Sequence, residues 1–287
     1  MFASVRPAAV AGLFYPAAPD ELRAMLEGYL ARARMSLISQ ANTQHSQAKN
    51  LDSTNSSGSI NTLNSPKVII VPHAGYIYSG LVAAHAYALI ESMAATVNKV
   101  LLIGPAHRVY LQGGALPQNH YFETPLGQIS IDKRSVEMLE SNPHVTVSDL
   151  PHSQEHSLEV QLPFLQHCLN QFELIPLLIG ESDPQGMAKL LELLWGGEET
   201  LVVVSTDLSH FHHYAEATSL DKLTCQKILQ AQETIFPEQA CGSSSLNALQ
   251  PQLKRHQLCL TQLSYQNSGD TAGDKDRVVG YASFASR

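Results

Sequence analysis

Residues 67–80, KVIIVPHAGYIYSG, contain the pattern that governs the architecture of this chain. A short apolar run is followed directly by Pro72 and His73, and a helix-like stretch begins at Ser79. Three more apolar runs resemble it: KVLLIGPAH (99–107), FELIPLLIG (172–180) and TLVVVSTDLSH (200–210). Continuous apolar strands that alternate with helices are typical of a parallel or mixed sheet covered on both faces. The sequence therefore predicts the α/β class, with a single-domain sandwich around a mixed, largely parallel sheet.

The 287 residues are expected to form one domain, 1–287, with a low-complexity insertion at about 40–65. This segment is rich in Ser, Asn, Gln and Thr, so it cannot bury enough apolar surface to offset the entropy of ordering it. Other expected elements are an antiparallel hairpin within 118–132, helices at 134–141, 155–169, 183–196, about 214–232 and about 243–249, and strands at 256–265 and 277–285.

The charge balance excludes several classes of partner. Lys and Arg number 18 and Asp and Glu 26, which gives a net charge of −8. Such a chain attracts neither nucleic acid nor an anionic membrane, so neither is predicted as a partner. The apolar runs are much shorter than the roughly 18 residues of a membrane span. The first residues contain no apolar stretch like that of a secretory signal, which predicts a cytoplasmic location.

Chemically useful side chains follow three of the predicted strands. His73 follows the first, His107 the second, and Asp207 and His210 follow the run at 200–204. Ligands bind at the carboxyl edge of an open α/β sheet, where parallel strands end together. A single histidine after a strand is more often a hydrogen-bonded loop residue than a ligand. Three strand ends that deliver His, His and Asp/His to one edge nevertheless indicate a metal or catalytic site.

The segment EHSLE at 155–159 allows two interpretations. In one it is a capped helix start, where Glu155 suits the helix dipole. In the other, His156 points into the same cleft as an acid/base group. Five other histidines are assigned to packing or to the surface: His85 to the core, and His120, His144, His167 and His256 to surface or structural positions.

Four cysteines without a CxxC pair argue against a disulfide framework and against a zinc ribbon. Cys241 precedes a predicted helix start, where the dipole is expected to lower the thiol pKa and favour the thiolate. Cys168, Cys225 and Cys259 are expected to be small core residues.

Taken together, the motifs resemble those of the MEMO-like family, whose prokaryotic members are called AmmeMemoRadiSam system protein B. The matching pieces extend over nearly the whole chain in family order: RPAAVAGLFYP from Arg6, PHAGYIYSG from Pro72, GPAH from Gly104, EHSLEVQLPFL from Glu155, STDLSHF from Ser205, ACG at Ala240 and SGDTAGDKDRVVGYASFA from Ser268. The insertion at about 40–65 departs from the family, which usually has a shorter connection there.

The resemblance implies a fold similar to that of class III extradiol dioxygenases. It also implies a mononuclear metal, Fe(II) or copper rather than zinc, held by His73, His107 and Cys241. Asp207 and His210 would line the same cleft, and His156 could join them. The family name further suggests a radical SAM protein as a partner. Since the dioxygenases use a carboxylate where this chain has a cysteine, catechol cleavage is in doubt.

Three hypotheses about function follow. The first is a dioxygenase-like, metal-dependent oxidoreductase, in which Asp207 orients a ligand histidine or accepts a proton and His210 relays protons. The alternative is a non-enzymatic protein that binds a peptide or small molecule, or carries metal, in the same cleft. Aromatic residues near the motifs are compatible with that alternative: Tyr76, Tyr78 and Phe211. A third, less favoured hypothesis is a hydrolytic zinc enzyme with Asp207 or Glu155 as the base.

Overall fold

The computed structural model describes residues 4–49 and 65–287. In these residues nine strands form one large mixed sheet. Its centre consists of four parallel strands, in spatial order β2 (Val68–Val71), β9 (Thr200–Ser205), β3 (Lys99–Pro105) and β8 (Glu173–Ile179). These are the four apolar runs of the sequence, and the predicted α/β class is confirmed.

Antiparallel strands extend the sheet on both sides. On one side, β12 (Val278–Ser286) pairs with β2 and also with β11 (Leu260–Asn267) and β10 (His210–His212). On the other, β4 (Gly114–Leu116) is antiparallel to β8 and parallel to β7 (Val145–Val147). The sheet is mixed, as predicted, but its pairings are four parallel and four antiparallel.

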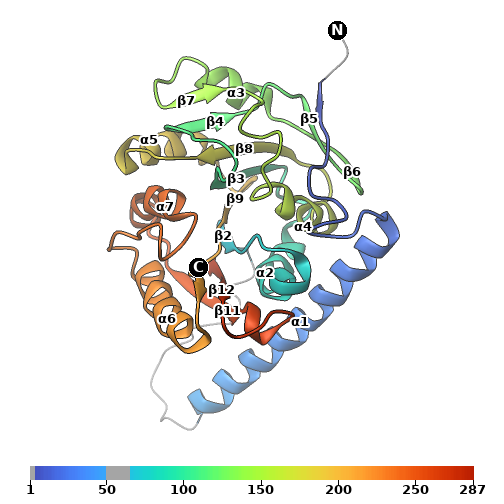
Figure 1. The fold of residues 1–287 in the computed structure, drawn as a ribbon, viewed down its shortest axis with the longest axis vertical. Coiled ribbons are helices and arrows are strands. Elements are labelled where there is room, and N and C mark those ends of the chain that lie inside the picture. Colours follow the sequence, from blue (N-terminus) through green and yellow to red (C-terminus); the bar gives the residue numbers. More distant parts are fainter. Residues whose placement is uncertain (1–3, 50–64) are drawn as a thin grey trace.

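Helices cover both faces of this sheet (Figure 1). One face carries α1 (Pro19–Lys49), α2 (Tyr76–Ile90) and α4 (Leu162–Cys168), and the other carries α5 (Pro184–Leu194), α6 (Tyr214–Gln230) and α7 (Ser243–Arg255). Successive side chains of a strand point to opposite faces. Accordingly Ile69 and Val71 enter one core cluster and Val68 and Ile70 the other. Both faces are buried, which explains why the strand is apolar without interruption.

The predicted hairpin exists but belongs to a separate sheet. β5 (Tyr121–Thr124) and β6 (Gly127–Ser130) are antiparallel, and β1 (Val5–Arg6) adds to β5 in parallel. The shorter helices are α3 (Lys133–Leu139) and the 3₁₀ turns η2 (Glu91–Met93), η3 (Glu159–Gln161) and η4 (Ser268–Asp270).

Some expected boundaries differ from the structure. Helix α1 continues through Lys49, into the start of the expected insertion at about 40–65. Residues 50–64 of that segment lie outside the described residues. The helix expected from residue 155 begins only at η3, because residues 155–158 are not helical and the Glu155 carboxylate accepts the amides of His156 and Ser157.

Two further predictions concern single elements. Helix α7 is longer than expected and passes through Pro251. Cys168 and Cys225 are buried as predicted, but Cys259 is exposed, because it lies just before β11 rather than inside a strand. No helix in the described residues has the length and apolar character to cross a membrane.

Helix α1 gives a test of the packing. Leu26 is fully buried against the core, whereas Met35 on the same helix is 73% exposed. We expect Leu26→Ala to lower the free energy of unfolding by about 2–5 kcal/mol, because it leaves a cavity. Met35→Ala, the matched control, should change it by less than about 0.5 kcal/mol. Urea denaturation measures both, and equal losses would contradict the described packing of α1.

Candidate metal centre

Three histidines from distant parts of the chain meet at the carboxyl edge of the central strands. His73 follows β2, His107 follows β3, and His156 comes from the turn before η3. One ring nitrogen from each lies within 4.8 Å of the others. The structure therefore brings together two strand-end histidines as predicted, and it places His156 with them, which favours the second interpretation of that segment.

The hydrogen bonds of His73 reveal which ring nitrogen carries the proton. Its Nδ1 lies 2.9 Å from Ser205 Oγ, and Ser205 donates its only hydroxyl proton to the Ser157 carbonyl. Ser205 Oγ must then accept from His73, so Nδ1 is protonated and Nε2 carries the lone pair. Burial lowers the pKa of His73 well below its usual value, with the other histidines adding to the effect. The ring is therefore neutral, the form that binds metals.

Glu155 holds His107 in the corresponding orientation. One carboxylate oxygen lies 3.0 Å from His107 Nδ1, and the other accepts the His107 backbone amide at 2.5 Å. Burial raises the pKa of Glu155, but the hydrogen bonds from His107 and from backbone amides outweigh it and lower the pKa to about 2. A carboxylate that accepts from one imidazole nitrogen leaves the other free for a ligand, an arrangement that is typical of metal-binding histidines.

His156 lies between His107 and the N-terminal residues. Its ring stacks on His107 with 4.8 Å between centroids and contacts Phe14 at the same separation. Its Nδ1 is 3.2 Å from the Glu155 carboxylate, but the geometry is not that of a hydrogen bond, and this buried nitrogen has no hydrogen-bond partner among the described residues. Burial lowers the pKa of His156 to about 4, so this ring too is neutral at pH 7.

Cys241 lies at the edge of the cluster, just before the cap residue Gly242 of α7. Its Sγ is 3.3 Å from His73 Nε2 and accepts the Asp207 amide at 3.3 Å. Burial, together with the Asp207 charge, raises the pKa of the thiol to about 12. The prediction of a lowered pKa is therefore wrong for the metal-free protein, because desolvation outweighs the helix dipole.

Asp207 lies in the segment after β9, and His210 begins β10; of their predicted roles, ring orientation by Asp207 has no supporting contact. Asp207 accepts the backbone amide of His73 at 2.8 Å and touches no ligand ring through a hydrogen bond. Ring orientation comes instead from Ser205 and Glu155. Burial raises the pKa of Asp207 to about 7 and lowers that of His210. His210 lies opposite Val279 in the sheet, close enough for its charge to act on His73.

The donor set fits a metal ion. A metal bonded at about 2.0–2.1 Å to each nitrogen would hold the nitrogens within about 4.2 Å, so the rings need to close by only a fraction of an ångström. His73 Nε2 and His107 Nε2 are available, and one ring nitrogen of His156 lies within 4.8 Å of the other two. A metal would also displace the thiol proton of Cys241, since thiolate is the form that ligates.

Sequence reasoning missed two orienting residues. Ser205 was visible only as the first residue of STDLSH, and Glu155 was interpreted as a helix-capping residue or a base. Two of the histidines assigned to packing or structural positions have such contacts. His85 is buried and bonds the Leu81 carbonyl, while His256 stacks on Trp195.

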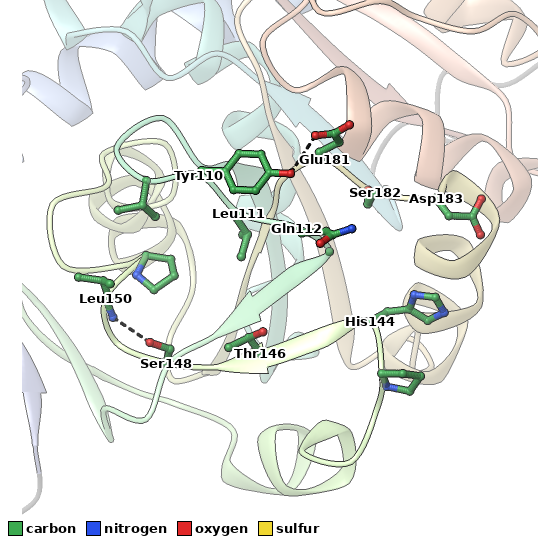
Figure 2. Close-up of a pocket in the computed structure, with 14 residues that line it drawn as sticks. Tyr110, Leu111, Gln112, His144, Thr146, Ser148, Leu150, Glu181, Ser182 and Asp183 are labelled. Atoms are coloured by element: carbon green, nitrogen blue, oxygen red, sulfur yellow. Dashed lines mark hydrogen bonds between the residues drawn. The ribbon is translucent and has the colours of Figure 1, made fainter.

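A groove of 1040 Å³ is lined by the segment after β3, the segment around β7 and the segment after β8 (Figure 2). Its apolar side contains Tyr110 and Leu150, and its polar side contains Glu181, Asp183 and His144. Val109 lines it two residues after His107, but none of the predicted site residues does. The groove is therefore a neighbour of the histidine cluster and not the cluster itself.

Comparisons with known proteins point to one family. A family model described as Memo-like protein matches residues 6–285. Proteins called MEMO1 family protein are similar over nearly their whole length: one from Methanosarcina barkeri is 31% identical, covering 98% of this chain and 99% of the relative. Another, from Sulfurisphaera tokodaii, is 30% identical, with coverages of 97% and 98%. A solved structure of an uncharacterised Escherichia coli K12 protein aligns with a TM-score of 0.46 at 13% identity, covering 75% of this chain and 98% of that one.

The raised thiol pKa predicts low reactivity of Cys241. In metal-free protein at about pH 8, we expect iodoacetamide to label the exposed Cys259 and to leave Cys241 largely unmodified, because only the thiolate attacks. Mass spectrometry of tryptic peptides gives both rates from one sample. Labelling of Cys241 as fast as that of Cys259 would contradict a protonated thiol.

The raised pKa of Asp207 predicts how stability depends on pH. The carboxyl group titrates at about 7 in the folded protein and near 3.8 when unperturbed. Between these values the folded state holds a proton that the unfolded state has lost, so stability falls as pH rises. The metal-free Asp207→Asn variant avoids this loss of roughly 1.4 kcal/mol per pH unit across that interval. It should therefore be more stable than wild type above pH 7 and equal to it below pH 4.

Urea denaturation across this pH range measures the difference. Glu198→Gln is the control, because Glu198 is exposed and its substitution should leave the pH profile unchanged. A profile for Asp207→Asn that runs parallel to that of wild type would show that Asp207 titrates normally.

Proposed function

Because the chain belongs to the Memo-like family, we propose that it holds one metal ion, iron or copper, at the histidine cluster and carries out redox chemistry there. The observation that carries the proposal is the meeting of three imidazoles, with one ring nitrogen of each within 4.8 Å of the others and with the metal-facing nitrogens of two of them set by hydrogen bonds. Neutral, pre-oriented imidazoles are what a metal needs and what a solvated surface cluster lacks.

The proposed ligands are His73, His107 and Cys241, with His156 as the adjacent fourth donor. A set of two histidines and a thiolate suits copper or iron, since sulfur is a soft ligand. The position of Cys241 against His73 supports this set, and the proximity of His156 to both other rings supports its inclusion. Three protein ligands would leave a coordination position for a small-molecule or peptide ligand.

When bound, the metal would supply electron transfer and Lewis-acid activation at that open position. The chain's own residues do the rest. Ser205 and Glu155 hold the rings of His73 and His107. Asp207, with its pKa near 7, can accept and return a proton at neutral pH, and His210 can exchange protons at the rim. This division of roles is the dioxygenase-like hypothesis, without an assigned substrate.

The non-enzymatic alternative has a supporting observation of its own. Phe211 is 61% exposed beside His210, and its backbone has a φ of 65°, which is unusual for a residue other than glycine. A strained, exposed aromatic residue at the rim suits the binding of a peptide or small ligand. The zinc-hydrolase hypothesis gains nothing comparable for Glu155, since its carboxylate oxygens already accept from His107, His156 and Ser157.

Two further parts of the proposal concern the setting of the protein. A radical SAM protein remains the partner that the family resemblance suggests. A cytoplasmic location agrees with the four free cysteines, because reducing compartments keep thiols reduced.

Metal analysis tests the proposed ligands. Protein purified without oxygen should contain close to one iron or copper per chain, and His73→Ala, His107→Ala and Cys241→Ser should each lose most of it. His144→Ala, in the neighbouring groove, is the matched control and should retain it. Unchanged metal content in His73→Ala and His107→Ala would refute the site. Oxygen consumption with a panel of catechols and thiols, abolished in Cys241→Ser, would favour an enzyme, whereas tight peptide binding without metal would favour the binding protein.

A further inference from the structure

The N-terminal arm, residues 4–16, is bonded to the segment that carries Glu155 and His156. We propose that this arm is a clamp on the metal centre: it holds the segment 152–161 in place, so that arm docking and metal binding strengthen each other. The inference rests on the proposed metal site, and its residues are positioning residues that do not touch the metal.

Arg6 joins the arm to both ends of the segment. Its side chain is buried, and each of its guanidinium nitrogens donates to the segment: Nε to the His152 carbonyl at 2.6 Å, Nη2 to the Glu155 carbonyl at 2.7 Å and Nη1 to the Glu159 carboxylate at 2.7 Å. Nη1 also donates to the Pro7 carbonyl, within the arm, at 3.3 Å. Three fixed donors on one planar group define the separation and the orientation of their acceptors. Arg6 therefore sets the backbone of Glu155 directly.

Glu159 receives the rest of the arm. This carboxylate is fully buried and accepts the amides of Ala9 at 2.8 Å and Val10 at 3.0 Å, and the Tyr15 hydroxyl at 2.6 Å. Together with Arg6, every recorded donor to Glu159 comes from the arm. A buried carboxylate without its donors is strongly unfavourable, so the segment keeps this conformation only while the arm is docked.

Anchoring of the segment 152–161 by the arm also fixes the positions of the histidines. Glu155 lies between the two anchored points, His152 and Glu159, and its carboxylate orients His107. The arm also touches the cluster itself, because the Phe14 ring packs on His156 with 4.8 Å between centroids. The Phe14 carbonyl accepts the amide of Tyr76, three residues after His73. The arm thus contacts or orients the surroundings of all three histidines.

Coupling between the arm and the metal follows from linkage. A metal that binds better when the rings are oriented also favours the docked arm, and the reciprocal effect has the same size. Weakening the arm should therefore reduce metal affinity although no ligand is changed. Bound metal should in turn slow amide hydrogen exchange in residues 4–16, an effect that a merely structural arm would not show.

Two arm variants and one control test the clamp. Tyr15→Phe removes one donor to Glu159 and leaves Arg6 and two amides in place, so the fold should survive; Arg6→Lys is the stronger change. Arg34→Gln is the control, because Arg34 also forms ion pairs, with Glu27 and Glu91, but on α1. Zn(II), which is redox-inactive, is the probe, and its affinity is measured by competition with a chelator.

We expect both arm variants to bind Zn(II) on the order of tenfold more weakly, as is typical for the loss of residues that orient ligands. Arg34→Gln should bind as wild type does, and Zn(II) should slow exchange at residues 4–16 in wild type. The clamp would be overturned if Tyr15→Phe bound Zn(II) as tightly as wild type and if Zn(II) did not change amide hydrogen exchange at residues 4–16. If Arg6→Lys does not fold, the Zn(II) affinity of Tyr15→Phe alone decides whether the clamp exists.

The clamp and the proposed function fail in different ways. A wild-type protein that binds no Zn(II), iron or copper at this centre refutes the proposed function and the coupling to metal. Amide hydrogen exchange in the metal-free protein then still tests the contact between the arm and the segment 152–161. Tyr15→Phe should speed exchange at residues 152–161 and leave exchange in β3 unchanged. Equal exchange in wild type and variant would refute the clamp as well.

Discussion

Two carboxylates buried four residues apart, Glu155 and Glu159, organise the functional edge of this protein. Neither can remain charged away from water unless the chain supplies donors. Glu159 draws its donors from the N-terminal arm, and Glu155 draws them from His107 and from backbone amides beside it. The need to pair these two charges therefore joins the arm, the loop after β3 and the turn before η3 into one unit.

The same burial gives the centre its chemical character. Desolvation keeps His73 and His156 neutral and Cys241 protonated. The rings are held by partners on their outer sides, and the cluster needs no large rearrangement to surround an ion. Desolvation also raises the pKa of Asp207 to about 7, so this carboxyl group is suited to exchange protons at neutral pH. Desolvation thus sets the protonation of the proposed ligands and also the pKa of Asp207 beside them.

The fold could be predicted because its main signal is local and periodic. The continuous apolar runs at 68–71, 100–104 and 201–204 predicted strands buried on both faces, and all three lie at the centre of the sheet. The placement of His73 and His107 directly after such runs also predicted that they would share one edge, since the carboxyl ends of parallel strands lie together, although β9 separates their two strands. The conformation of residues 155–158 was harder to predict. The apolar residues that follow have helical spacing, and this spacing is the same whether residues 155–158 are helical or are held by the Glu155 side chain.

From the sequence alone one could read the α/β class, the strand-end histidines and the family resemblance, because each depends on residue order or on spacing within a few positions. The contacts between side chains that are far apart in the sequence could not be predicted from residue order or spacing. Arg6 meets Glu159 across 153 positions and Cys241 meets His73 across 168. The thiol prediction was wrong for a related reason: a helix dipole can be inferred from nearby residues, whereas desolvation depends on everything that packs around the sulfur. Hydrogen-bond partners and loss of water are set by packing of the whole chain, and they determine how this centre can work.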